Sequence, residues 1–198
     1  PQANLIFQTY FEALINAEVL SDLPVAAFGL DFVHGLEDNL AAVESGLFKD
    51  KEVFAGVVDG RNVWANDFVS TSQLLTSLQD KVGSLVIQPS CSLLHVPVTT
   101  KNETDLDPVL QKGLAFADEK LLEIKLLADE LDGIDNPAYQ EHIAQYDALQ
   151  QADFRNVALE NIDEVATRRS SDFAERHQVQ QDKLKLPLLP TTTRSEER

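Results

Sequence analysis

The chain has 198 residues, of which 43% are hydrophobic and 25% are charged, and its formal net charge is −17. The length and the apolar share suit a globular domain rather than a disordered chain, and no apolar run approaches the roughly 18 residues that a membrane span needs. Nucleic-acid phosphates and anionic lipids would repel so negative a chain, so we expect neither a nucleic acid nor a membrane as its partner.

Cysteine and methionine usage bears on the origin of the chain. The single cysteine, Cys91, can form neither an internal disulfide nor a cysteine-rich zinc site, which favours a reducing compartment. No basic-then-apolar leader follows Pro1, and methionine is absent altogether. We therefore expect a cytoplasmic segment of a longer protein.

Short apolar runs alternate with helix-like stretches in the first 133 residues. The runs at 4–9, 25–32, 52–59 and 84–89 are rich in β-branched and aromatic residues and are apolar nearly throughout, as strands buried on both faces should be. Amphipathic stretches at 11–20, 39–45 and 67–81 lie between them. This alternation predicts an α/β fold with about four βα units and parallel strands.

Helices dominate the rest of the predicted structure. Asp107 as a cap and Pro108 in the first turn predict the start of one long helix, for which Gly133 is a suitable end. Helical, strand-poor sequence continues to about residue 184, and a proline-containing stretch follows it. We therefore divide the chain into an α/β part at 1–133, a helical extension at 134–185 and a linker or tail at 186–198.

Polar side chains follow each predicted strand. In parallel α/β sheets the loops after the strands open on one face, so these groups should converge there. The candidates for a substrate-binding rim are Asp31, Asp59, Arg61, Asn62 and His95.

Each candidate also has a structural interpretation. Residues 59–62 form a turn signal, Asp31 is equally suited to capping the next helix, and a lone cysteine such as Cys91 is more often buried than nucleophilic. The four histidines and Cys91 show no His-x-Cys, Cys-x-x-Cys or His-x-x-x-His spacing, and the glycines match no phosphate-loop pattern. We therefore assign no catalytic residue and no metal ligand from the pattern.

Several blocks in collinear order resemble the N-terminal domain of the cobalamin-independent methionine synthases. They are Gln8-Thr-Tyr-Phe, Gly29-Leu-Asp-Phe-Val-His-Gly, Ala55-Gly-Val-Val-Asp-Gly-Arg-Asn-Val-Trp, Ser90-Cys-Ser-Leu-Leu-His-Val-Pro, Asn102-Glu-Thr, Leu114-Ala-Phe-Ala and Leu186-Pro-Leu-Leu-Pro-Thr-Thr-Thr. The resemblance implies the second half of a (β/α)8 barrel followed by the connector to a second, C-terminal barrel. It also implies a parent enzyme that transfers a methyl group from methyl-tetrahydropteroyl-polyglutamate to homocysteine in methionine biosynthesis.

The same resemblance implies where a metal should be sought. The family's catalytic zinc lies in the C-terminal barrel, and the two barrels are thought to derive from a duplication. The positions that would echo the zinc ligands in this chain are Gln8, Tyr10, Asp31 and Cys91. Amide and phenol cannot replace imidazole and thiolate, so we expect no cofactor in this segment.

Two functional hypotheses remain open at this point. In the first, the chain is a structural segment of the methyltransferase and is inactive alone, with the N-terminal half-barrel and the catalytic barrel of the parent chain as its partners. In the second, it is a free-standing half-barrel that binds a small anionic ligand or a protein partner without catalysis. Four strands cannot close an eight-stranded barrel, so self-association through the open sheet edges is also expected.

Overall fold

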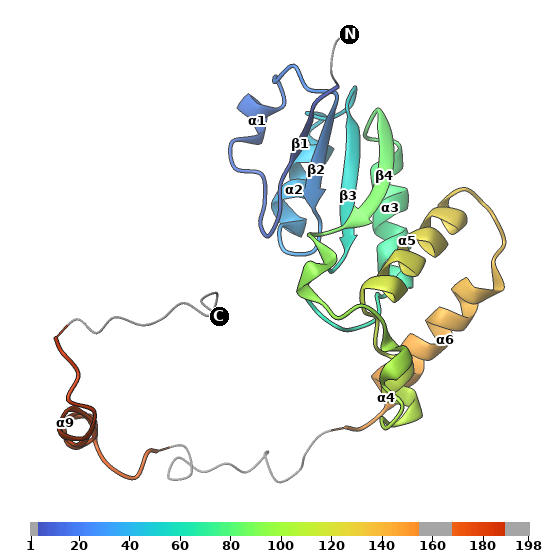
Figure 1. Ribbon diagram of the computed structural model, residues 1–198. Coiled ribbons are helices and arrows are strands. Elements are labelled where there is room, and N and C mark those ends of the chain that lie inside the picture. Colours follow the sequence, from blue (N-terminus) through green and yellow to red (C-terminus); the bar gives the residue numbers. More distant parts are fainter. Residues whose placement is uncertain (1–3, 155–167, 189–198) are drawn as a thin grey trace. The chain divides into compact units, whose positions relative to one another are not determined.

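Four parallel strands form one open sheet in the computed structural model, which describes residues 4–154 and 168–188. The sheet order β1-β2-β3-β4 follows the chain, with β1 at Ile6–Gln8, β2 at Ala27–Asp31, β3 at Glu52–Val58 and β4 at Ser84–Pro89 (Figure 1). All three strand pairs are parallel. The predicted α/β class is confirmed, and the sheet is consistent with part of a barrel.

The two inner strands explain why the sequence runs are apolar. Every residue of β2 is buried, and in β3 only Glu52 and Phe54 are partly exposed. The ring of Phe28 in β2 contacts those of Phe7 and Phe48, at centroid distances of 5.9 and 5.1 Å. The outer strands β1 and β4 are only partly buried, because each has a neighbour on one side alone within the described sheet.

Helices α2 (Leu36–Glu44), α3 (Phe68–Gln79) and α5 (Ala117–Leu131) follow β2, β3 and β4 and pack on the sheet (Figure 1). The prediction of a helix over 11–20 was wrong for most of its length, since only α1 at Ala17–Leu20 is helical. The backbone is left-handed at Phe11 (φ 73°) and at Asn16 (φ 58°), which interrupts a helix. The interruption is stabilised by side chains of the β2–α2 region, because Asp31 and Asn39 accept the amide protons of Phe11 and Leu14.

The prediction of one long helix from Asp107 to Gly133 was also wrong. Asp107 does cap a helix, α4, but this helix ends after Pro108–Lys112, and α5 begins at Ala117. Between them, Leu114 forms an antiparallel bridge with Trp64, flanked by hydrogen bonds from Ala65 N to Gly113 O and from Ala115 N to Val63 O. These tertiary hydrogen bonds replace the helical ones that the apolar rhythm predicted.

We expect Gly113→Ala to lower the free energy of unfolding by about 1–2 kcal/mol, because a Cβ at this position would lie 2.6 Å from a methyl carbon of Leu149. Urea unfolding of Gly113→Ala, Leu149→Ala and the double variant measures the coupling. The double variant should be more stable than the sum of the single effects predicts. Strict additivity would contradict the steric explanation.

The compact part of the chain continues past Gly133. Helix α6 (Pro137–Gln151) packs against α3, α4 and α5, and its Tyr139 hydroxyl lies 2.7 Å from Ser72 Oγ. Residues 1–152 therefore belong to one compact unit and residues 153–198 to another. The predicted division of the chain after Gly133 stays a prediction, and α6, which follows that position, packs within the first unit.

The second unit contains α9 (Phe173–Leu184), which begins at the capping residue Asp172. Its Phe173, Val179 and Leu184 side chains are exposed. The predicted linker begins within the described residues, at 186–188, and its remainder at 189–198 lies outside them. Among the helices that the structure describes, none is both long and apolar enough to cross a membrane.

Candidate functional site

The loops that follow the four strands meet at the carboxyl edge of the sheet. Residues 9–11 follow β1, residues 32–35 follow β2, residues 59–64 follow β3 and residues 90–95 follow β4. Because the strands are parallel and adjacent, the sequence-predicted rim residues all belong to this edge (Figure 1).

Asp31 organises two of these loops. Its side chain is completely buried, and Oδ1 accepts the amide protons of Val33 and His34 at 2.8 and 2.9 Å. Oδ2 accepts the amide proton of Phe11 at 2.8 Å and lies 3.2 Å from His34 Nδ1. Both oxygens are thus committed to holding the β1 and β2 loops. The helix-capping role that the sequence suggested for Asp31 was wrong, because α2 begins after Gly35 without a side-chain cap and the Asp31 carboxylate is engaged by loop amides instead.

Asp59 organises the loop after β3. Its Oδ1 accepts the amide protons of Arg61 and Asn62, and Oδ2 accepts a proton from the Asn62 side chain at 2.7 Å. The turn predicted at 59–62 is therefore present. It leaves the Arg61 side chain exposed at the rim.

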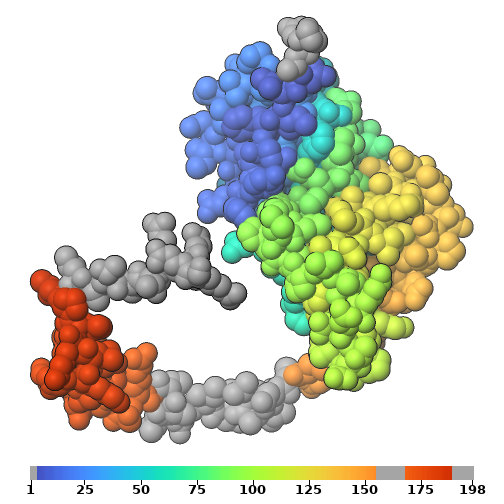
Figure 2. All heavy atoms as spheres, in the orientation of Figure 1, coloured from blue at the N-terminus to red at the C-terminus, as the bar shows by residue number. Residues whose placement is uncertain are grey.

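A residue that the sequence pattern did not single out joins three of the loops. The ring of Phe11 lies 5.1 Å from the Arg61 guanidinium carbon and 5.9 Å from the ring of His95, which it meets edge to face. In Figure 2 the blue N-terminal region of the surface adjoins the green region that follows β4. The exposed cluster of Phe11, Arg61 and His95 combines a cation, an imidazole and an aromatic face.

The positions that would echo a zinc site do not fit zinc. Gln8 donates its side-chain amide proton to Thr9 O, and both Asp31 oxygens already accept backbone protons. Burial raises the pKa of the Cys91 thiol, which disfavours the thiolate that zinc binds. Within residues 4–154 and 168–188 the structure contains no group of three or more His, Cys, Asp or Glu residues that could hold a metal ion.

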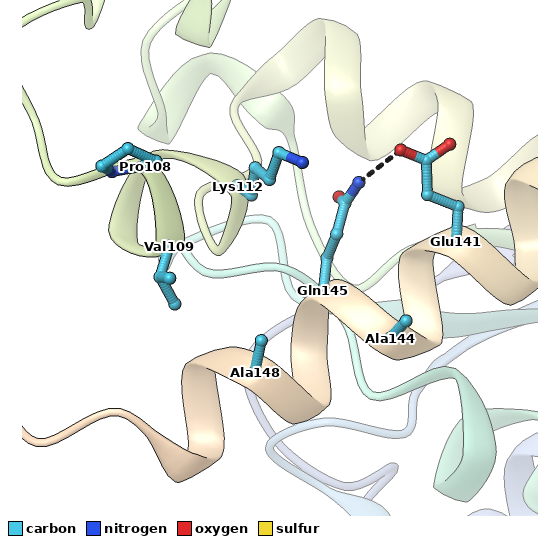
Figure 3. Close-up of a pocket in the computed structure, with 7 residues that line it drawn as sticks. All are labelled: Pro108, Val109, Lys112, Glu141, Ala144, Gln145 and Ala148. Atoms are coloured by element: carbon cyan, nitrogen blue, oxygen red, sulfur yellow. Dashed lines mark hydrogen bonds between the residues drawn. The ribbon is translucent and has the colours of Figure 1, made fainter.

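Two hollows lie outside the predicted rim residues. One of about 680 Å³ lies between the β1–α1 and β2–α2 loops and is lined in part by Phe11, His34 and Glu37. The other, of about 380 Å³, lies between α4 and α6, where Val109 and Ala148 supply apolar walls and Gln145 is hydrogen-bonded to Glu141 (Figure 3). Asp31, Asp59, Arg61, Asn62 and His95 line neither hollow. Their joint role in one concavity stays a prediction.

Comparison with known proteins identifies the sequence relatives of the chain. Residues 1–83 match the family model described as "Cobalamin-independent synthase, N-terminal domain". A 5-methyltetrahydropteroyltriglutamate–homocysteine methyltransferase of Streptococcus mutans is 68% identical over 193 residues. Proteins of the same name from Streptococcus agalactiae and Listeria monocytogenes are 56% and 46% identical.

The aligned region is a different share of this chain than of each relative. Each alignment covers 98% of this chain but only 26 or 27% of the relative. The chain thus spans about a quarter of the length of the curated relatives it matches. Over nearly its whole length the chain is therefore similar to a segment of these methyltransferases, and its residues 1–83 match the N-terminal domain of the cobalamin-independent synthases.

Proposed function

We propose that this chain is a structural segment of a 5-methyltetrahydropteroyltriglutamate–homocysteine methyltransferase. The observation that carries the proposal is 68% identity over nearly the whole chain to a quarter of such an enzyme. The segment would form the second half of the N-terminal barrel and continue into the connector to the catalytic barrel. Its own contribution would be to complete and brace that architecture in a cytoplasmic enzyme of methionine biosynthesis.

The described site chemistry supports a structural role. Asp31, Asp59 and Asn39 use their polar atoms in loop and helix hydrogen bonds, and the Cys91 thiol is buried with a raised pKa. None of these groups is prepared for nucleophilic or metal-assisted methyl transfer. Zinc would be supplied by the catalytic barrel of the parent enzyme.

A segment exchange tests the proposal. We expect a Streptococcus mutans methyltransferase whose matching 193 residues are replaced by those of this chain to retain methyl transfer to homocysteine, because 68% identity preserves most packing contacts. This chain alone should have no activity. Activity of the isolated chain, or a folded but inactive exchange protein, would contradict the proposal.

One specific observation at the rim favours the second hypothesis, in which the chain binds a small anionic ligand without catalysis. Arg61 and His95 both contact the exposed Phe11 ring, and the cluster offers a cation and an aromatic face to a flat anionic ligand. If Asp31, Asp59, Arg61, Asn62 and His95 serve such a ligand, the isolated chain should bind a folate polyglutamate in calorimetry, and Arg61→Ala should weaken that binding. Unchanged binding in Arg61→Ala, or no binding to the unmodified chain, would leave the rim with a structural role only.

We also expect the isolated chain to self-associate. The outer strands β1 and β4 each lack one neighbour in the described sheet, and the side chains of Leu5 and Ile6 are 60 and 50% exposed. Pairing of open edges would bury these groups, although the net charge of −17 opposes close approach at low salt. Light scattering should therefore give a mass above 22.0 kDa that rises with salt. A monomer at all salt concentrations would contradict this expectation.

A further inference from the structure

Helix α5 carries a buried lysine and a buried glutamate that hold the segment between β3 and α3. Lys120 and Glu123 are 1 and 2% exposed. Lys120 Nζ donates to the carbonyl oxygen of Trp64 at 3.0 Å, and Glu123 Oε1 accepts the amide proton of Asn66 at 2.9 Å. The two side chains therefore attach residues 64–66 to α5.

The second carboxylate oxygen of Glu123 has no such partner. Oε2 is the one buried side-chain N or O atom without a hydrogen bond among the described residues. Glu123 lines a small cavity of about 130 Å³ between residue 65, α5 and α6. A cavity of this volume has room for water, and an ionised oxygen without a partner is costly to bury.

The groups around Glu123 leave this oxygen without a hydrogen bond, although the nearby charge of Lys120 favours the ionised carboxylate. On α5, Glu119 engages its carboxylate with Thr99, Thr100 and Phe116, and Lys120 donates to Trp64. From α6, His142 Nε2 lies 3.8 Å from Oε1 and 2.8 Å from Asn66 O.

Two further polar side chains complete the cavity wall. These are Gln145 of α6 and the exposed Lys112 of α4. Neither forms a hydrogen bond with Oε2, so a proton or water must satisfy the oxygen.

We infer that Glu123 is a proton-dependent switch on residues 64–66: the neutral side chain favours the closed segment, and the ionised side chain favours an open form in which bulk solvent hydrates the whole carboxylate. The open form would release the Asn66 amide and the Trp64 carbonyl from α5. Because only one residue separates residues 59–62 from this segment, the switch would set how firmly the loop with Asp59 and Arg61 is held at the rim.

The titration behaviour agrees with this geometry. Burial raises the pKa of Glu123 from 4.5 to about 7, while the Asn66 hydrogen bond and Lys120 act in the opposite direction. The closed form therefore binds a proton more tightly than an open, hydrated form. Opening should increase by about two orders of magnitude as the pH rises from below 4.5 to above 7.

Amide hydrogen exchange of the complete 198-residue chain tests the inference. The protection factor of the Asn66 amide, corrected for intrinsic exchange, should fall between pH 5 and pH 8 in the unmodified chain. In Glu123→Gln, which keeps an oxygen to accept the Asn66 proton, it should be independent of pH in the upper part of this range. Glu130→Gln removes the same charge from an exposed position of α5 and should behave like the unmodified chain.

A second variant distinguishes the titration of His142 from that of Glu123. Burial lowers its pKa below 6.5, so its own titration ends below the upper part of the Glu123 range. His142→Gln should keep the fall in protection above pH 6.5. Loss of that fall in His142→Gln, or its persistence in Glu123→Gln, would overturn the inference.

Infrared spectroscopy covers the case in which Glu123→Gln does not fold. A protonated carboxyl band that titrates near pH 7 in the unmodified chain would support the switch. Absence of that band at pH 6 would overturn it. The emission of Trp64, the single tryptophan of the chain, gives an independent record of the same transition.

Discussion

Replacing Asp31 by Asn is expected to lower the free energy of unfolding by about 3 kcal/mol, because a buried carboxylate accepts three backbone amide protons in the native chain. An asparagine side chain has one acceptor oxygen, which can serve Val33 and His34. Its NH2 group would then face the amide of Phe11, donor against donor. Urea unfolding followed by circular dichroism measures the loss.

Asp59→Asn is the matched control. Asp59 also accepts backbone protons, but it does so in a turn at the partly exposed rim, where asparagine forms the same type of turn. We expect this variant to lose less than about 1 kcal/mol. Equal losses in the two variants would show that burial of Asp31 contributes nothing to its effect.

Glu123→Gln is expected to make the chain more stable at pH 8, by about 1–3 kcal/mol relative to the unmodified chain. The pKa of Glu123 is about 7 in the folded state and 4.5 when the group is unperturbed. Between these values the folded state binds more protons than the unfolded state, so the Glu123 contribution to stability falls as the pH rises. Glutamine removes this loss because it does not ionise.

His142 changes the pH dependence of the unfolding free energy in the opposite direction. Burial lowers its folded-state pKa below 6.5, so the unfolded state binds the proton more tightly and stability rises with pH through that range. The difference in unfolding free energy between Glu123→Gln and the unmodified chain, measured from pH 4 to pH 8, isolates Glu123. A difference that does not grow with pH would contradict the prediction.

The class of the fold could be predicted because the signal is local. Runs such as 52–59 and 84–89 are apolar and β-branched, and β3 and β4 occupy nearly those ranges. The helix predictions were wrong where a tertiary hydrogen bond replaced a helical one. Nothing in the local sequence shows that the Trp64–Leu114 bridge would divide the predicted helix, or that Asp31 would hold Phe11 in a left-handed conformation.

The candidate site was predictable only in outline. The parallel strands and the loop positions follow from the alternation of strands and helices, so the sequence could place Asp31, Asp59 and His95 at one edge. Nothing in it indicates that Phe11 contacts both Arg61 and His95, because these three residues lie in different loops. The buried pair Lys120 and Glu123 was missed for a related reason: charged residues on an amphipathic helix normally face solvent, and only the packed structure shows both to be buried.

The order of the sheet has a consequence for how the chain is built during synthesis. Each strand pairs with the strand that directly precedes it in the sequence, as in the pairs Ile6 with Ala27, Ala27 with Glu52 and Glu52 with Ser84. The paired positions lie roughly 20 to 30 residues apart, so every addition closes a loop of similar entropic cost. No strand must wait for a later one, and the sheet can grow in step with translation from β1 to β4.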